Sequence, residues 1–284
     1  MEFGVHICAF DWDGGPPAMA ATFAATARDA EAAGARYVTL MDHFIQAEGF
    51  MPPEDPILEG YAGLAYLAGV TERVELALLV TGVLFRSPAV LAKTVTTVDV
   101  LSGGRAVLGI GGAWYAREHA ALGIDFPSAG ERLGRMEETI RACKQIWSDD
   151  DGPFAGAYHS LSETMAAPEP LRQPHPPIMV GGGGEKTTLK IVARHADLWN
   201  IAAFGVEPVG KKLDLLRAHC DAEGRDVDTI AKTILWMADP RDEPDTFKRD
   251  LEGYENLGVE TVFMIPYGPD PRRAVADLAA LMPR

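Results

Sequence analysis

The sequence predicts one closed barrel of eight parallel strands, each followed by a helix: a (β/α)8 TIM barrel. Short apolar, β-branched segments alternate along the chain with segments of helical periodicity, an order that favours parallel strands joined by right-handed crossovers. The alternation gives eight strand–helix units, and an open doubly wound sheet does not need the last two. The length of 284 residues is typical of a single barrel, which contains about 250 residues before insertions.

The strands are predicted from apolar runs bounded by turn residues, and the helices from apolar residues spaced three or four apart. Ser87-Pro88 places an N-cap before a proline at the first helical position, and Gly34 ends the first helix. The predicted strands comprise residues 3–10, 36–41, 73–83, 105–110, 178–181, 196–202, 230–237 and 259–265. The predicted helices comprise residues 19–33, 57–69, 88–101, 133–147, 187–195, 206–223, 246–257 and 271–281.

Residues 148–177 interrupt this order before the fifth strand. The segment contains the acidic run Asp149–Asp151 and six prolines, and it has no clear periodicity. A stretch of this length inside a compact fold is either a functional insertion or a lid. We therefore expect a single domain over residues 1–284 that carries an insertion at about 148–177.

The composition excludes several classes of partner. A net charge of −15 argues against nucleic acid or an anionic membrane, because binding phosphate-rich surfaces needs a basic face. Cys8, Cys143 and Cys220 form no CxxC pair, so free buried thiols in a reducing compartment are expected. The first residues lack a signal-peptide pattern, and no apolar run approaches the ~18 residues of a membrane span. We expect a cytoplasmic protein.

Four consecutive glycines, Gly181 to Gly184, join the fifth strand to the next helix. Glycines tolerate positive φ and let backbone N–H groups approach a ligand closely, and a helix that begins just afterwards adds unpaired N–H groups. The run is either a phosphate cradle or a turn that binds nothing. Its position at the carboxyl end of a barrel strand, where barrel sites lie, favours the cradle.

Asp42-His43 at the end of the second strand is the sharpest candidate for catalysis. A histidine at a strand end can exchange a proton near neutral pH, and the aspartate can accept hydrogen bonds from a cofactor. The alternative is an aspartate that caps the next turn and a histidine packed at the barrel rim.

Other common sites find no support in the sequence. Gly109 to Trp114 superficially matches GxGxxG, but a long helix follows it, and no acidic strand end lies about twenty residues on. Its small residues would instead let a flat ring lie close to the backbone. No metal-ligand spacing, P-loop or GxSxG motif is present.

Five motifs occur together in the order of a known family. They are Met41 to Phe44, Leu79 to Val83 with Arg86 to Ala89, Leu101 to Arg105, Gly109 to Trp114 with Glu118, and Pro177 to Thr188. Nearly the whole chain resembles the bacterial luciferase-like monooxygenase superfamily, and within it the branch of oxidoreductases that depend on the deazaflavin coenzyme F420.

This resemblance implies a homodimer that binds the deazaflavin at the strand ends. Leu79-Val80 would be a non-proline cis peptide against the back of the ring, Asp42 would contact the deazaflavin side chain, and His43 would be the catalytic proton donor. The implied cofactor-binding residues are Asp42, Leu79, Val80, Thr81, Gly111, Gly112, Ala113, Gly181, Gly182, Gly183 and Gly184.

The chain also departs from part of that branch. The glucose-6-phosphate dehydrogenases carry a tryptophan where this chain has Ala47 and a catalytic glutamate where it has Trp114, so sugar-phosphate oxidation is not expected. Aromatic residues suggest an apolar substrate pocket instead: Phe10, Trp12, Phe44, Trp114 and Phe204.

Three functional hypotheses follow. The first is an F420-dependent oxidoreductase that transfers a hydride between reduced deazaflavin and a small, largely apolar organic substrate. The second is an FMN-dependent monooxygenase of the same superfamily that uses O2, since the phosphate cradle suits both cofactors. The third is a flavin-binding protein without catalysis, against which the Asp42-His43 pair weighs.

Overall fold

Eight parallel strands close into a barrel in the computed structural model of this chain, which describes residues 1–48 and 50–283. The barrel strands, in their order around it, are β1 (Glu2–Ile7), β2 (Tyr37–Leu40), β3 (Glu75–Leu78), β5 (Ala106–Gly111), β8 (Ile178–Gly181), β9 (Leu198–Ala202), β10 (Ala231–Trp236) and β11 (Val259–Met264). Pairing of β1 with β11 and of β3 with β5 closes the sheet on itself. The predicted (β/α)8 barrel is confirmed.

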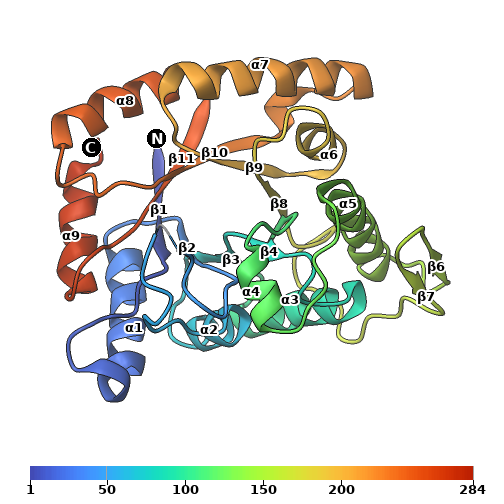
Figure 1. Ribbon diagram of the computed structural model, residues 1–284, viewed down its shortest axis with the longest axis horizontal. Coiled ribbons are helices and arrows are strands. Elements are labelled where there is room, and N and C mark those ends of the chain that lie inside the picture. The colour runs from blue at the N-terminus through green and yellow to red at the C-terminus, as the bar shows by residue number, and fades with distance from the viewer. Residues whose placement is uncertain (49, 284) are drawn as a thin grey trace.

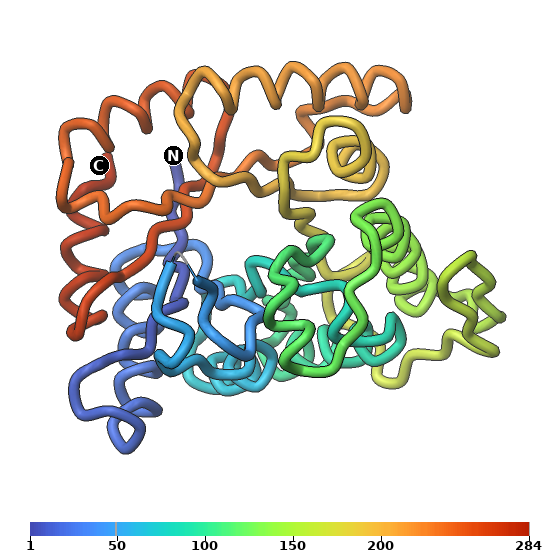
Figure 2. Tube along the Cα trace, in the orientation of Figure 1, coloured from blue at the N-terminus to red at the C-terminus, as the bar shows by residue number. Residues whose placement is uncertain are grey.

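Helices follow each barrel strand and surround the sheet (Figure 1). They are α1 (Gly15–Ala32), α2 (Gly60–Ala68), α3 (Pro88–Ser102), α4 (Ala116–Ala121), α5 (Ala129–Ile146), α6 (Thr188–His195), α7 (Val206–Glu223), α8 (Pro244–Asn256) and α9 (Pro271–Leu281). The sequence did not predict α4, because six residues are too few to show helical periodicity. The chain trace in Figure 2 shows that the first and last strands lie side by side, as their pairing requires.

The prediction of one continuous third strand over residues 73–83 is wrong. β3 ends at Leu78, and a short strand β4 (Thr81–Gly82) resumes beside Ile110 and Gly111 of β5. The peptide bond between Leu79 and Val80 is cis, as the family resemblance implied. The apolar run correctly indicated burial, but burial alone does not report whether the backbone remains extended.

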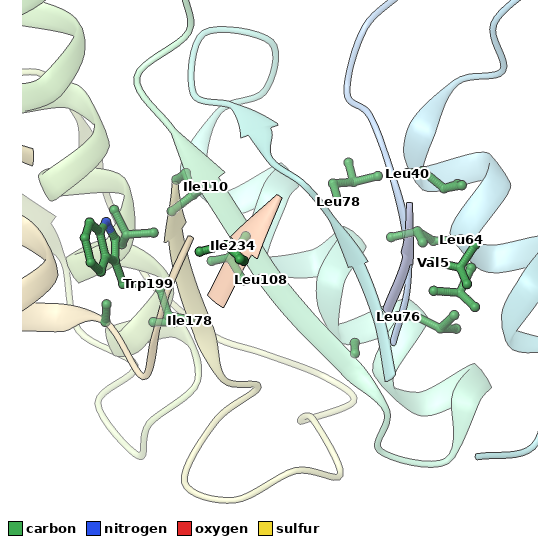
Figure 3. Close-up of a cluster of buried hydrophobic side chains, with 14 of the residues drawn as sticks. Val5, Leu40, Leu64, Leu76, Leu78, Leu108, Ile110, Ile178, Trp199 and Ile234 are labelled. Atoms are coloured by element: carbon green, nitrogen blue, oxygen red, sulfur yellow. The ribbon is translucent and has the colours of Figure 1, made fainter. Parts of the chain in front are cut away.

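Buried side chains form two layers on the two faces of the strands. The outer layer packs against the helices, as Val5, Leu40 and Leu76 do beside Leu64 of α2 (Figure 3). The inner layer fills the barrel with Tyr37 and Phe263, among others. Gly4 is required between these rings, since a Cβ there would lie 2.6 Å from Phe263 Cδ1.

The insertion packs outside the barrel. It contains a short hairpin, β6 (Phe154–Ala155) and β7 (Ser160–Leu161), which projects beyond α5 in Figure 1. Glu138 of α5 accepts backbone hydrogen bonds from residues 157–159, and Asp99 of α3 accepts those of Leu171 and Arg172. The insertion therefore braces the outer helices. Among the described residues it contributes nothing to the wall of the main cavity, so its position does not support the lid hypothesis.

Candidate active site

The carboxyl ends of several barrel strands surround a cavity of about 440 Å³. Every residue predicted to contact the cofactor or to act in catalysis lies on its wall: Asp42, His43, Leu79, Val80, Thr81, Gly111, Gly112, Ala113 and Gly181 to Gly184. These residues come from β2, β3, β4, β5 and β8 and the loops that follow them. The barrel thus brings together residues that lie up to about half the chain apart in sequence.

Val80 forms part of the cavity wall, and the neighbouring strands make room for it. A Cβ on Gly111 would lie 2.7 Å from Val80 Cγ2, and one on Gly181 would lie 2.9 Å from the same atom. Gly109 is constrained in the same way, because its Cβ would lie 1.9 Å from the carbonyl oxygen of Leu78. The packing of Leu78 and Val80 therefore requires glycine at these three positions, whether or not a ligand is bound.

His43 is oriented by a buried glutamate. Its Nδ1 lies 2.8 Å from Oε2 of Glu118, whose side chain is fully buried at the start of α4. The other carboxylate oxygen accepts the N–H groups of Phe44 and Ile45 at 2.6 and 3.2 Å. Burial acts to raise the pKa of Glu118, but the hydrogen bonds from His43 and these two amides outweigh it and lower the pKa.

This arrangement defines the proton positions on His43. The ionised carboxylate only accepts hydrogen bonds, so Nδ1 carries a proton and Nε2 is the nitrogen that gains or loses one. No hydrogen-bond partner of Nε2 occurs among residues 1–48 and 50–283. Deeper in the barrel, His6 bonds Thr39 at 2.9 Å, and burial together with His43 lowers the pKa of His6 to about 3, so His6 remains neutral.

Asp42 is engaged in holding β4. Its Oδ2 accepts the Gly82 N–H at 2.9 Å and Arg86 Nη1 at 2.8 Å, and its Oδ1 accepts Arg86 at 3.0 Å. Arg86 also bonds Glu59 and lies 4.6 Å from the centroid of the Tyr61 ring. Burial raises the pKa of Asp42 despite the guanidinium. Asp42 thus lies on the cavity wall with both oxygens already bonded.

The glycine run leaves donors free on the opposite strand ends. Gly182 has φ +117° and donates to the Asn200 carbonyl at 2.9 Å. In the part of the chain that the structure describes, the N–H groups of Gly183 and Gly184 reach no acceptor. A Cβ on Gly184 would lie 2.6 Å from Oγ1 of Thr188, the first residue of α6. Free N–H groups beside a hydroxyl and a helix start fit a phosphate group.

Two further cavity residues were missed by sequence reasoning. Arg132, in the first turns of α5, donates to the Gly112 and Pro127 carbonyls and stacks 4.0 Å from the Phe126 centroid. It places a guanidinium on the wall that the glycine run also lines. His119 Nδ1 bonds the Tyr115 carbonyl at 3.0 Å, and its buried Nε2 has no partner among the described residues.

The predicted apolar pocket is largely wrong. Phe10 and Trp12 pack with Phe23 of α1 in the core, with ring centroids 5.0 to 6.3 Å apart, because the chain after β1 turns outward to α1. Phe44 and Phe204 are exposed and do not line the cavity. Trp114 alone of the five residues lies on the cavity wall.

The described residues offer neither a metal site nor an activated thiol at Cys8 or Cys143. No group of three His, Cys, Asp or Glu residues in the described chain could hold a metal ion. Burial raises the pKa of the Cys8 and Cys143 thiols to about 12, so both remain protonated. No helix among the described residues is long and apolar enough to cross a membrane.

Comparison with known proteins identifies the family. A family model described as luciferase-like monooxygenase matches residues 1–270. The chain belongs to the luciferase-like monooxygenase family. Enzymes that use F420 and enzymes that use FMNH2 both occur among its relatives, so the family is one of oxidoreductases and monooxygenases with flavin-type cofactors.

Two curated relatives illustrate this division. The FMNH2-dependent dimethylsulfone monooxygenase of Pseudomonas putida is 30% identical over 180 residues, which cover 61% of this chain and 49% of that protein. The F420-dependent glucose-6-phosphate dehydrogenase of Kineococcus radiotolerans is 34% identical over 217 residues, which cover 72% of this chain and 60% of that one. The chain thus spans only about half to three-fifths of the length of these relatives.

A solved structure supports the fold. An F420-dependent secondary alcohol dehydrogenase in complex with an F420–acetone adduct is similar with a TM-score of 0.83 and 16% identity. The similarity covers 99% of this chain and 98% of that one. At this identity the likeness shows the architecture, a luciferase-like TIM barrel.

Proposed function

We propose that this protein is a coenzyme F420-dependent oxidoreductase that transfers a hydride between reduced deazaflavin and a small, largely apolar organic substrate. The observation that carries the proposal is His43 on the cavity wall, with Nδ1 fixed by buried Glu118 and Nε2 without a partner in the described chain. An imidazole oriented by a carboxylate is suited to general acid–base catalysis. Reduction of an activated alkene, imine or carbonyl group needs such a proton donor.

The cavity residues suit a flavin-type cofactor. The free N–H groups of Gly183 and Gly184, with the Thr188 hydroxyl and Arg132, would hold its phosphate. Val80 and the loop Gly111–Ala113 would support its ring system. When bound in its reduced form, F420 supplies the hydride.

His43 would complete the reduction by donating the Nε2 proton to the substrate atom that becomes basic. The Nδ1 proton stays on the ring and donates a hydrogen bond to the Glu118 carboxylate, whose negative charge stabilises the imidazolium before that transfer. In the direction of substrate oxidation, Nε2 would accept the proton instead. The Asp42–Arg86 pair keeps β4, and with it Thr81 and Gly82, in place on the cavity wall.

An FMN-dependent monooxygenase is the second candidate. The relative from Pseudomonas putida, named as FMNH2-dependent, favours it, and the cradle recognises a phosphate that both cofactors possess. The two hypotheses differ in whether O2 is consumed. A binding protein without catalysis is the third outcome that an experiment must distinguish.

Titration of the purified protein with F420 and with FMN, followed by fluorescence, tests the proposal. We expect tight binding of F420, and oxidation of reduced F420 by an electron-poor alkene in the absence of O2. Tight FMN binding with no F420 affinity, together with O2 consumption, would establish the monooxygenase instead. Binding without turnover under either condition would leave a non-catalytic flavin-binding protein.

The family resemblance also underlies our proposal of a cytoplasmic homodimer that acts on a small-molecule substrate. Light scattering from the protein as it elutes from a size-exclusion column measures the mass in solution. A mass of one chain at micromolar concentration would contradict the dimer.

A further inference from the structure

An exposed aromatic surface lies beside His43 at the open side of the cavity. Trp114 lines the cavity but remains 55% exposed, and its ring centroid lies 5.7 Å from that of His43. Phe50, also 55% exposed, lies 6.1 Å from Trp114 in an edge-to-face arrangement. Large apolar side chains left together in water at a cavity mouth mark a surface that a ligand covers.

The backbone holds Trp114 in this exposed position. Ala113, the residue before it, has φ +55°, a left-handed conformation that residues other than glycine rarely adopt. The indole stacks on the buried Tyr115 ring at 5.2 Å, and the Tyr115 hydroxyl accepts the Glu48 N–H at 3.4 Å. Strained residues of this kind cluster at ligand sites, where the surrounding structure enforces them.

The size of the cavity indicates that a substrate would also need the surface formed by Trp114 and Phe50. A volume of about 440 Å³ lies near the lower end of the range, roughly 300–1,000 Å³, of pockets that hold one drug-sized ligand. A flavin-type cofactor therefore leaves little interior space. The exposed indole of Trp114 offers contact area next to the His43 ring, and Phe50 extends that area.

Arg117 and Glu118, the charged residues that follow Trp114 most closely in the chain, already have partners. Arg117 forms an ion pair with Glu48, and Glu118 is held by His43 and two backbone amides. A charged substrate would find no free counter-ion in these residues. The surface thus suits an uncharged, planar molecule that can stack on an indole.

We propose that Trp114 and Phe50 form a substrate subsite for uncharged, planar conjugated carbonyl compounds that bear an aryl group. This inference rests on the proposed hydride transfer. The hydride adds to the β-carbon of the C=C bond and the His43 Nε2 proton is transferred to the α-carbon. The π bond is thereby replaced by two C–H bonds, and the reduced cofactor loses two electrons.

Turnover of a matched pair of enones tests the subsite. We expect the wild type to have a KM for 4-phenylbut-3-en-2-one that is tenfold or more below that for pent-3-en-2-one, in which methyl replaces phenyl. Trp114→Ala should raise the KM of the phenyl enone roughly tenfold while that of pent-3-en-2-one stays within about twofold. Trp114→Phe should retain most of the preference. Phe204→Ala, an equally drastic change at an exposed aromatic residue outside the cavity, should alter neither value.

A binding measurement separates this inference from the proposed function. Ligand-observed NMR with 4-phenylbutan-2-one, which cannot be reduced at a C=C bond, requires no turnover. Binding to the wild type that is lost in Trp114→Ala and weakened in Phe50→Ala supports the subsite even if neither enone is reduced. That absence of turnover would refute the reduction of these enones, whereas the titration with F420 and FMN tests the hydride-transfer function separately. Equal binding to wild type and both variants, or an equal effect of Trp114→Ala on the two enones, would overturn the subsite.

Discussion

Two parts of the cavity wall differ in whether their polar groups already have hydrogen-bond partners within the protein. At the ends of β2 to β5, Asp42, Glu118 and His43 Nδ1 are all bonded to specific partners. At the β8–α6 junction, the N–H groups of Gly183 and Gly184 have no acceptor among the described residues. Satisfied groups fix the geometry that proton transfer needs, whereas unsatisfied donors are available to a ligand. Changes in the first part should therefore affect turnover or stability, and changes in the second should affect affinity.

The largest effect is expected from His43→Ala. Loss of a general acid typically costs about 10²- to 10⁴-fold in rate, so turnover with F420 should fall by that amount. The cofactor dissociation constant should stay close to that of the wild type, because the anion cradle is intact. Stopped-flow oxidation of reduced F420 and fluorescence titration measure the two quantities. Unchanged turnover would remove His43 from the mechanism.

Arg86→Met tests the hydrogen-bonded part of the wall, at the ends of β2 to β5, through the stability of the protein. The variant leaves the buried Asp42 carboxylate without its guanidinium, and breaking such a pair costs about 3 kcal/mol in the free energy of unfolding. Urea unfolding measures the loss. The double variant with Asp42→Asn is the control, and its loss should be smaller than the sum of the two single losses. Additive losses would show that the pair does not act as a unit.

Gly184→Ala tests the β8–α6 junction, where N–H groups lack acceptors, through the affinity for the cofactor. The new methyl group meets Thr188 Oγ1, so either the loop or the Thr188 side chain must shift, and the cofactor dissociation constant should rise roughly tenfold, or about 1.4 kcal/mol. Turnover at saturating cofactor should change little. Gly130→Ala is the matched control, since its Cβ would meet no described atom within 4 Å and its backbone is helical. A tenfold loss of affinity in both variants would contradict a local role for Gly184.

Glu118→Gln tests the charge next to His43. The amide can still accept the hydrogen bond of the Nδ1 proton but no longer carries the negative charge that stabilises the imidazolium, so kcat should fall, by less than in His43→Ala. Stopped-flow oxidation of reduced F420 measures kcat. An unchanged kcat would mean that Glu118 only supports the backbone of Phe44 and Ile45.

The smallest effect concerns acid stability. The pKa of Glu118 lies below its usual value of 4.5 in the folded chain, so its stabilising contribution is complete above that value and is lost as the pH falls through the folded pKa. As the pH falls below about 4.5 and the Glu118 carboxylate of the wild type becomes protonated, the difference in unfolding free energy between wild type and Glu118→Gln should narrow. A difference that widens toward acid would contradict the lowered pKa.

The sequence predicted the barrel and the wall of the cavity well, because both depend on local signals. Apolar runs and glycine or proline boundaries mark each strand, and strand ends in a barrel converge at one face. The same reasoning located His43 and the run Gly181 to Gly184. Gly109 and Gly111 were interpreted as room for a ligand ring, and in the structure they also make room for Leu78 of β3 and for Val80.

Contacts between residues far apart in the chain could not be predicted from the sequence. Glu118 lies 75 residues from His43, and no local pattern specifies that contact. Arg132 is one of several charged residues on α5, and only the turn of the helix at the cavity wall distinguishes it. Phe10 and Trp12 were misassigned because an aromatic residue after a strand can face the core as readily as a pocket.

The fit of Val80 between Gly111 and Gly181 couples the sizes of three residues that lie far apart in sequence. A methyl group on either glycine would collide with the valine, so an engineer who enlarges residue 111 or 181 must first shrink residue 80. Conversely, replacing Val80 by alanine enlarges the cavity and leaves His43 and the free N–H groups of Gly183 and Gly184 unchanged in sequence. The size of the cavity can therefore be redesigned independently of its proton donor and its anion site.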